Sequence, residues 1–159
     1  QPNTVFRNPG LTGKWVPLTT EAGLTASPSA LHRGCAFGDF DGDGRVDVVV
    51  TALGRDAEIW MNHSSHSGHW LDIALRGTRS NRDGIGALIQ VNLPNGTKQY
   101  NRVTTSVGYA SSSEVIARFG LGPYSLAKQA VIHWPSGHVQ TLNNLQSGQI
   151  HIVREGGNR

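Results

Sequence analysis

Short apolar runs recur along the whole chain, and Gly, Pro, Asn or Ser residues separate each run from the next. Many runs are rich in β-branched or aromatic side chains, which favour strands over helices. Only one stretch, residues 125–129, favours a turn of helix. The pattern therefore predicts an all-β chain with strands at residues 5–7, 15–18, 34–37, 46–51, 58–62, 70–75, 87–92, 98–103, 115–119, 130–133, 139–142 and 149–153.

Two turns carry strong hairpin signals, and one polar stretch divides the chain. The dipeptide NG at 95–96 and the tripeptide PSG at 135–137 each join two predicted strands with residues that suit tight turns. Residues 62–68 are rich in Ser and His, so we place a domain boundary there. The predicted units are residues 1–62 and residues 69–159, and the hairpins of the second could close as a β-sandwich.

The densest chemistry lies in an acidic stretch with the sequence DFDGDGRVD. Calcium takes six to eight oxygen ligands at roughly 2.3–2.6 Å, and carboxylates at alternating positions around glycines can supply them. The glycines allow the tight backbone that such a loop needs. We expect a Ca²⁺ site formed by the carboxylates of Asp39, Asp41 and Asp43, the backbone carbonyl of Arg45, and Asp47 either directly or through water.

An EF-hand does not fit this stretch. An EF-hand places a Glu at the twelfth loop position and a helix on each side. The twelfth position here is Val50, and the β-branched run at 46–51 follows the acidic residues. The calcium is therefore expected to be mainly structural and to tie a turn to a strand.

These residues resemble known families. Residues 35–44, CAFGDFDGDG, resemble the FG-GAP or VCBS repeat, the calcium-bearing unit of integrin-type β-propeller blades. The second half resembles the ASPIC/UnbV domain in four stretches, which are HWL at 69–71, LRGTRSNRDGIGA at 75–87, FGLG at 119–122 and HWPSG at 133–137.

The resemblance implies a blade-like calcium-loop segment packed on an antiparallel β-sandwich. It also implies an extracellular or cell-surface protein, with many bacterial members in the family, and it carries no agreed activity. A propeller needs several blades, and the chain has one such loop. We therefore expect the C-terminal piece of a longer protein.

Four histidines are candidates for catalysis, although the question of an enzyme stays open. A calcium ion can polarise a carbonyl while a nearby histidine acts as base, which would suit hydrolysis of lactones or esters. The candidates are His32, His63, His66 and His69. The three-residue spacing of the last three does not place them on one face, which disfavours a second metal site. No G-x-S-x-G motif is present, so we expect the serines at 111–113 to be hydrogen-bonding residues of turns and strand edges.

A second polar loop lies between predicted strands at residues 76–86. Forked Arg donors would suit an anion- or carbohydrate-binding loop. The alternative is a long ordered turn stabilised by an Arg82–Asp83 pair or by Asn81. The candidate ligand residues are Arg79, Asn81, Arg82 and Asp83.

The aromatic and sulfur-containing residues favour structural roles. The four tryptophans lie in strand-like contexts, so we expect core positions more than sugar-binding platforms. They are Trp15, Trp60, Trp70 and Trp134. Cys35 is the single cysteine, so it forms no internal disulfide, and we expect it to be buried in a strand.

Charge and length exclude some classes of protein. The formal net charge is +3, but the basic residues are scattered singly, which disfavours nucleic-acid binding. No run approaches the roughly 20 apolar residues of a membrane span. The chain starts at Gln1 with neither an initiator Met nor a signal peptide, so we expect a processed form or a fragment.

These observations favour a secreted or cell-surface calcium-binding β module for adhesion or ligand binding. Its partner would be a protein, a carbohydrate or a small molecule. A calcium-dependent lactone or ester hydrolase is the first alternative, and a carbohydrate-binding module is the second.

Overall fold

The computed structural model describes residues 3–8, 13–24, 29–65, 68–106 and 108–156, and no α-helix occurs among them. The strands, in chain order, are β1 (Phe6–Arg7), β2 (Val16–Pro17), β3 (His32–Gly38), β4 (Asp47–Ala52), β5 (Glu58–Trp60), β6 (His69–Arg76), β7 (Leu88–Asn92), β8 (Lys98–Arg102), β9 (Ala117–Gly122), β10 (Leu126–His133), β11 (Val139–Gln146) and β12 (Ile150–Arg154). The predicted all-β fold is confirmed.

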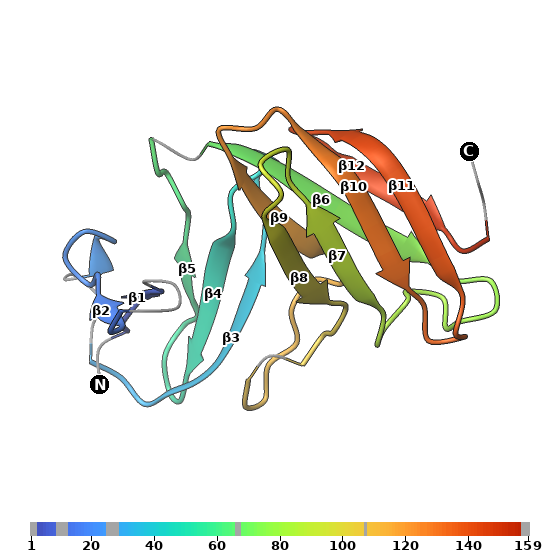
Figure 1. Ribbon diagram of the computed structural model, residues 1–159. Helices are drawn as coiled ribbons and strands as arrows, with labels where there is room; N and C mark the ends of the chain where they lie inside the picture. Colours follow the sequence, from blue (N-terminus) through green and yellow to red (C-terminus); the bar gives the residue numbers. More distant parts are fainter. Residues whose placement is uncertain (1–2, 9–12, 25–28, 66–67, 107, 157–159) are drawn as a thin grey trace.

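The strands form four sheets, and Figure 1 shows how they are arranged. A two-stranded ribbon (β1-β2) and a three-stranded sheet (β3-β4-β5) make up the first part of the chain. In the second part, a four-stranded sheet (β11-β10-β7-β8) lies in front of a three-stranded sheet (β12-β6-β9), which gives a sandwich. The strand pairs are antiparallel except β12 with β6, which is parallel. The predicted hairpins at 95–96 and 135–137 are confirmed as the β7–β8 and β10–β11 turns.

The predicted helical turn at 125–129 is wrong. Leu126 and Ala127 already belong to β10, where they pair with Gln146 and Leu145 of β11. The Ala127 side chain is fully buried in the sandwich. Burial between two sheets overrides a weak local helix preference.

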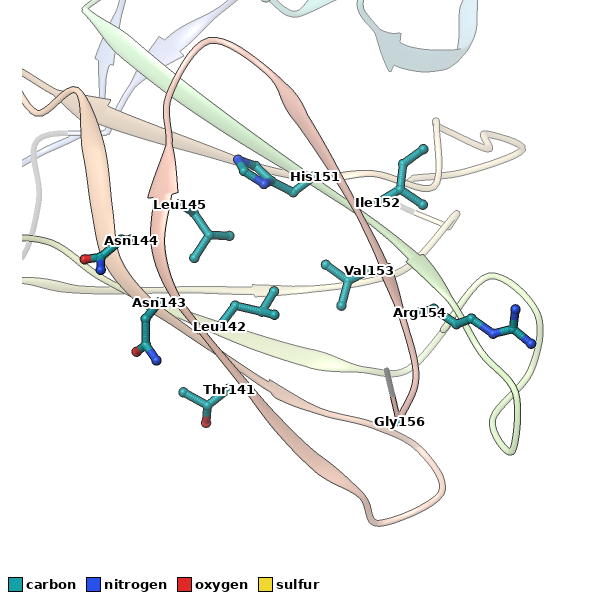
Figure 2. A pocket seen from close by; sticks show the side chains of 10 residues that line it. All are labelled: Thr141, Leu142, Asn143, Asn144, Leu145, His151, Ile152, Val153, Arg154 and Gly156. Carbon is teal, nitrogen blue, oxygen red and sulfur yellow. The ribbon is translucent and has the colours of Figure 1, made fainter. Parts of the chain in front are cut away.

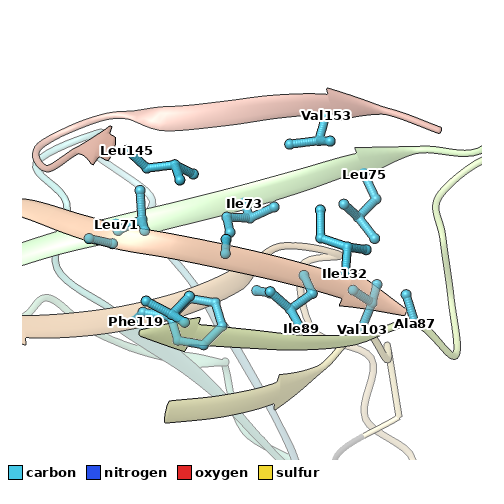
Figure 3. Close-up of a cluster of buried hydrophobic side chains, with 14 of the residues drawn as sticks. Leu71, Ile73, Leu75, Ala87, Ile89, Val103, Phe119, Ile132, Leu145 and Val153 are labelled. Carbon is cyan, nitrogen blue, oxygen red and sulfur yellow. The ribbon is translucent and has the colours of Figure 1, made fainter. Parts of the chain in front are cut away.

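The sandwich core comes from the inward-facing residues of both sheets (Figure 3). Leu71, Ile73 and Leu75 alternate along β6 and are at most 1% exposed. Ile89 of β7 and Ile132 of β10 face them from the other sheet and are fully buried. Each such side chain contributes roughly 1.5–3 kcal/mol relative to an exposed position.

The two sides of the sandwich differ. On one side, the side-chain amides of Gln99 and Asn101 in β8 donate to the carbonyls of Gly120 and Arg118 in β9, at 2.7 and 3.2 Å. On the other side, β11 and β12 leave an open groove. Figure 2 shows the residues that line this groove: Thr141, Leu142, Asn143, Asn144, Leu145, His151, Ile152, Val153, Arg154 and Gly156.

The loop before β9 links the sandwich to the free edge of β3. The backbone N–H of Cys35 donates to the Ser111 hydroxyl at 2.9 Å, and that of Phe37 donates to the Ser113 hydroxyl at 3.1 Å. The N–H of Glu114 returns a bond to the Phe37 carbonyl at 3.2 Å. The prediction of strand-edge hydrogen bonding for these serines is confirmed, and the loop covers an edge that would otherwise be open to pairing.

Burial of the tryptophans and the cysteine only partly follows the prediction. Trp134 is 3% exposed, and Trp60 and Trp70 are half-buried. Trp15 is 61% exposed, so the core prediction is wrong there, because its neighbours form only the short β1–β2 ribbon. Cys35 lies in a strand as expected but is half-buried rather than buried.

Candidate metal centre

The acidic stretch forms the turn between β3 and β4. One carboxylate oxygen from each of Asp39, Asp41 and Asp43 can be chosen so that the three lie within 4.8 Å of one another. Two oxygens on opposite sides of a calcium ion are roughly 5 Å apart, because each Ca–O distance is roughly 2.3–2.6 Å. The spacing of the three carboxylates therefore fits coordination of a divalent cation of the size of calcium.

Asp39 organises the loop as well as belonging to the cluster. Its carboxylate accepts hydrogen bonds from the backbone N–H groups of Gly42, Asp43 and Gly44, at 2.8, 3.0 and 2.9 Å. Gly42 and Gly44 have φ angles of +76° and +84°, which side chains with a Cβ rarely adopt. The DxDxDG spacing thus dictates a chain wrapped around one carboxylate.

Asp47 has a different environment from the other three aspartates. It is 2% exposed, and its two oxygens accept bonds from the N–H groups of Phe40 and Asn62, at 2.8 and 2.7 Å. The side chain thereby ties the loop to the chain leaving β5, outside the cluster of three carboxylates. Its role as a calcium ligand stays a prediction.

Arg45 contributes charge at this site through its side chain. Its guanidinium forms an ion pair with Asp43, and its Nε donates to the carbonyl of Asn62 at 2.6 Å. This positive charge offsets part of the repulsion between neighbouring carboxylates. The predicted use of the Arg45 carbonyl as a ligand is untested.

The acidic loop packs directly on the outer face of the β12-β6-β9 sheet. A Cβ at Gly44 would lie 2.1 Å from the Trp70 indole, so the loop backbone and this ring are in close contact. Beside them, Arg118 pairs with both Asp72 and Glu114. The pKa of Asp72 is raised to about 6, and burial is the largest cause. The charge of Arg118 opposes this rise, while the charges of Glu114 and Asp39 add to it.

The Asp72 environment predicts a pH effect on stability. The folded protein holds a proton on Asp72 up to about pH 6, whereas the unfolded chain releases it near 3.8. This group alone therefore makes stability fall as pH rises from about 3.8 to 6, and contributes no slope above that. Asp72→Asn should remove this component, measurable as a difference in the pH dependence of urea midpoints. Parallel profiles for variant and parent would contradict the prediction.

The structure separates the candidate histidines. His32 begins β3 and lies 3.1 Å from Glu58, whereas the acidic loop follows the other end of this 7-residue strand. At ~3.3 Å per residue the strand spans roughly 20 Å. The Nδ1 of His69 lies 3.2 Å from the Ser147 hydroxyl. His63 directly follows Asn62, whose backbone bonds the side chains of Asp47 and Arg45 at the loop. His66 lies outside the described residues.

The polar loop at 76–86 is an ordered turn. Arg82 pairs with Asp83 at 3.1 Å, which raises the pKa of Arg82 and lowers that of Asp83. Asn81 exchanges two hydrogen bonds of 2.8 Å with the backbone of Ile85. The role of Arg79 and its neighbours in ligand binding is untested.

The backbone amides of this turn bind the carboxylate of Glu155, the residue directly after β12. Glu155 is 4% exposed, and its Oε2 accepts bonds from the N–H groups of Thr78, Arg79 and Ser80, at 2.9, 2.8 and 2.7 Å. Its Oε1 accepts bonds from the hydroxyls of Ser80 and Ser136. The role of Glu155 could not be predicted from the sequence, because an isolated Glu carries no local signal for partners 75 residues earlier in the chain.

Fold and site together define an all-β protein in which an acidic loop of a blade-like sheet is docked on a β-sandwich. The family model described as "ASPIC and UnbV" matches residues 77–159, and the one described as "FG-GAP-like repeat" matches residues 1–50. The first match covers more than half of the chain, so the chain belongs to the ASPIC and UnbV family. Both resemblances noted from the sequence are confirmed.

Curated relatives carry the same name in three vertebrates. Cartilage acidic protein 1 from Homo sapiens is 26% identical over 144 residues, which cover 87% of this chain. The protein of that name from Xenopus tropicalis is 25% identical over 82% of this chain, and the one from Mus musculus is 25% identical over 87%. The chain spans about a fifth of the length of these relatives, from 20 to 22%. The described residues contain no helix of the length and apolar character needed to cross a bilayer.

Proposed function

We propose that the chain is a calcium-binding β module of an extracellular protein, with a structural ion in the loop and a sandwich that binds a ligand. The observation that carries the proposal is the cluster of three carboxylates, whose oxygens can lie within 4.8 Å of one another. The loop that bears them is already folded around the Asp39 carboxylate. When bound, calcium would supply positive charge that holds these carboxylates together.

An extracellular setting is supported by the FG-GAP-like match and by relatives named cartilage acidic protein 1. Extracellular calcium modules bind weakly, with dissociation constants of about 10⁻⁴–10⁻³ M, and a small exposed loop with few carboxylates suits that range. Asp41 is exposed, so exchange with solvent calcium would be easy.

The hydrolase alternative has less support. Calcium chemistry of that kind needs a base at the ion, and β3 separates His32 from the acidic loop. The close contact between Gly44 and Trp70 also fits a loop that holds two parts of the molecule together.

The proposal predicts a calcium-dependent melting temperature. A saturating concentration of 100 times Kd stabilises by about 2.7 kcal/mol, which is roughly 5–10 °C for a chain of this size. Asp41→Asn should lose this increase while changing the melting temperature in chelator little, because Asp41 is exposed. Thermal unfolding with calcium and with chelator is the measurement.

Asp56→Asn serves as the matched control. It removes an exposed carboxylate from the β4–β5 turn, outside the acidic loop, and should leave the melting temperature and its calcium response unchanged. Identical melting curves for the parent protein in calcium and in chelator would overturn the calcium part of the proposal.

A further inference from the structure

A row of side-chain amides crosses the outer face of the four-stranded sheet. Asn92 of β7 lies in register with Gln129 of β10, which lies in register with Asn143 of β11. The Asn92 amide donates to Oε1 of Gln129 at 2.9 Å, and the Gln129 amide donates to Oδ1 of Asn143 at 3.3 Å. Together these three residues form an amide row.

The amide row continues along the sheet into further polar and aromatic side chains. Gln90 donates to Oδ1 of Asn92 at 2.7 Å, and its register partner on β8 is Tyr100, which is 59% exposed. The next inward residues, such as Ala130 and Ile132, are fully buried, so the row faces away from the core. In Figure 1 no described segment crosses in front of this sheet.

The amide row lines a hollow that two lysines also line. The hollow has a volume of about 680 Å³, and its lining includes the whole row together with Lys98 and Lys128. Lys98 is the register partner of Asn92 on β8. Pro94 and Gly96 of the turn after β7 also line the hollow.

The charge of this sheet has one sign. Strands β7, β8, β10 and β11 contain no Asp or Glu, whereas they contain Lys98, Arg102 and Lys128. None of these three cations forms an ion pair with a carboxylate in the part of the chain that the structure describes. The face therefore complements a ligand that carries negative charge.

We propose that the amide row and its flanking lysines bind an acidic polysaccharide. Planar amides offer donors and acceptors together, which suits sugar hydroxyls that do the same. Lys98 and Lys128 would pair with carboxylate or sulfate groups, and the exposed Tyr100 ring offers an apolar face for a sugar ring. The inference deepens the ligand-binding part of the proposed function and does not depend on the calcium loop, which packs on the other sheet.

The test measures binding of the chain to heparin, hyaluronan, dextran and single-stranded DNA by calorimetry, at about 0.15 M ionic strength. We expect binding to heparin and hyaluronan and none to dextran. Binding of DNA as tight as that of heparin would assign the face to nucleic acids and overturn the proposal, as would the absence of binding to both acidic polysaccharides.

Variants distinguish specific binding at this face from nonspecific electrostatic attraction of an acidic polymer to a basic protein. Lys98→Ala and Gln129→Leu should each weaken heparin binding roughly tenfold, or about 1.4 kcal/mol. Gln129→Leu leaves the net charge unchanged, so its effect reports the amide row itself. If Gln129→Leu folds poorly, Asn143→Ala on the exposed edge strand removes another amide of the row. Arg55→Ala, which removes an exposed cation from the β4–β5 turn, is the matched control and should bind like the parent.

Equal affinity of parent, Gln129→Leu and Asn143→Ala, with a loss in Arg55→Ala as large as in Lys98→Ala, would indicate ion exchange only and overturn the proposal. The calcium proposal and the polysaccharide proposal can be refuted independently of each other. Asp41→Asn should keep heparin binding while losing the calcium response, and Lys98→Ala should do the reverse.

Discussion

Glu155→Ala is expected to lower the melting temperature by at least about 10 °C. The substitution leaves the N–H groups of Thr78, Arg79 and Ser80 without the acceptor that they share. Buried donors that lose a charged partner are among the most destabilising changes in proteins. The same carboxylate also accepts a hydrogen bond from Ser136 in the β10–β11 turn. The substitution therefore removes the links of residue 155 to the loop at 76–86 and to this turn at once.

Glu155→Gln separates the charge from the shape. Its amide oxygen can still accept from the three N–H groups, and its NH₂ can donate to the two hydroxyls, so we expect about half the loss of Glu155→Ala. Glu21→Gln removes the same charge from an exposed turn and should leave the melting temperature unchanged. A Glu155→Ala protein as stable as the parent would refute the structural role.

The same residue predicts behaviour in acid. Burial alone raises the pKa of Glu155, but the hydrogen bonds from Ser136, Ser80, Thr78 and Arg79 outweigh it and hold the pKa far below the ordinary 4.5. The unfolded chain takes up this proton near 4.5 and the folded chain does not, so stability is lost progressively as pH falls below about 4.5. In Glu155→Gln the loss of stability between pH 4.5 and 3 should be shallower than in the parent.

Local spacing made some features predictable, and distant pairing hid others. The DFDGDG stretch and the NG and PSG turns act within a few residues, so the acidic loop and both hairpins could be anticipated. Glu155 and the amide row become visible only when register brings distant strands together. The helical turn at 125–129 failed for a related reason, because pairing with β11 decides that stretch.

The grouping of charge on the sandwich was hidden in the sequence for the same reason. The basic residues look isolated along the sequence, yet the sheet order β11-β10-β7-β8 places Lys98 and Lys128 around one hollow. The sequence already shows that these four stretches lack acidic residues. Only the sheet order shows that the four strands form one face with a positive charge.

Gly44→Ala is expected to cost about 3 kcal/mol or more and to weaken docking of the acidic loop on the sandwich. The new Cβ would lie 2.1 Å from the Trp70 ring, and the backbone at φ +84° already disfavours a side chain. Because the loop cannot keep its shape and its contact with Trp70 together, Trp70 should become more exposed. Thermal unfolding and quenching of tryptophan fluorescence by acrylamide measure the two effects.

Gly42→Ala is the matched control, because it shares the positive φ, +76°, but has nothing within 4 Å of the added Cβ. It should cost only about 1 kcal/mol from the backbone, and the difference between the two variants isolates the contact with Trp70. In a Trp70→Ala background, Gly44→Ala should cost only about as much as Gly42→Ala, since the smaller residue leaves room for the methyl group and only the backbone strain remains. Equal stabilities for Gly42→Ala and Gly44→Ala would contradict close packing of the acidic loop on Trp70.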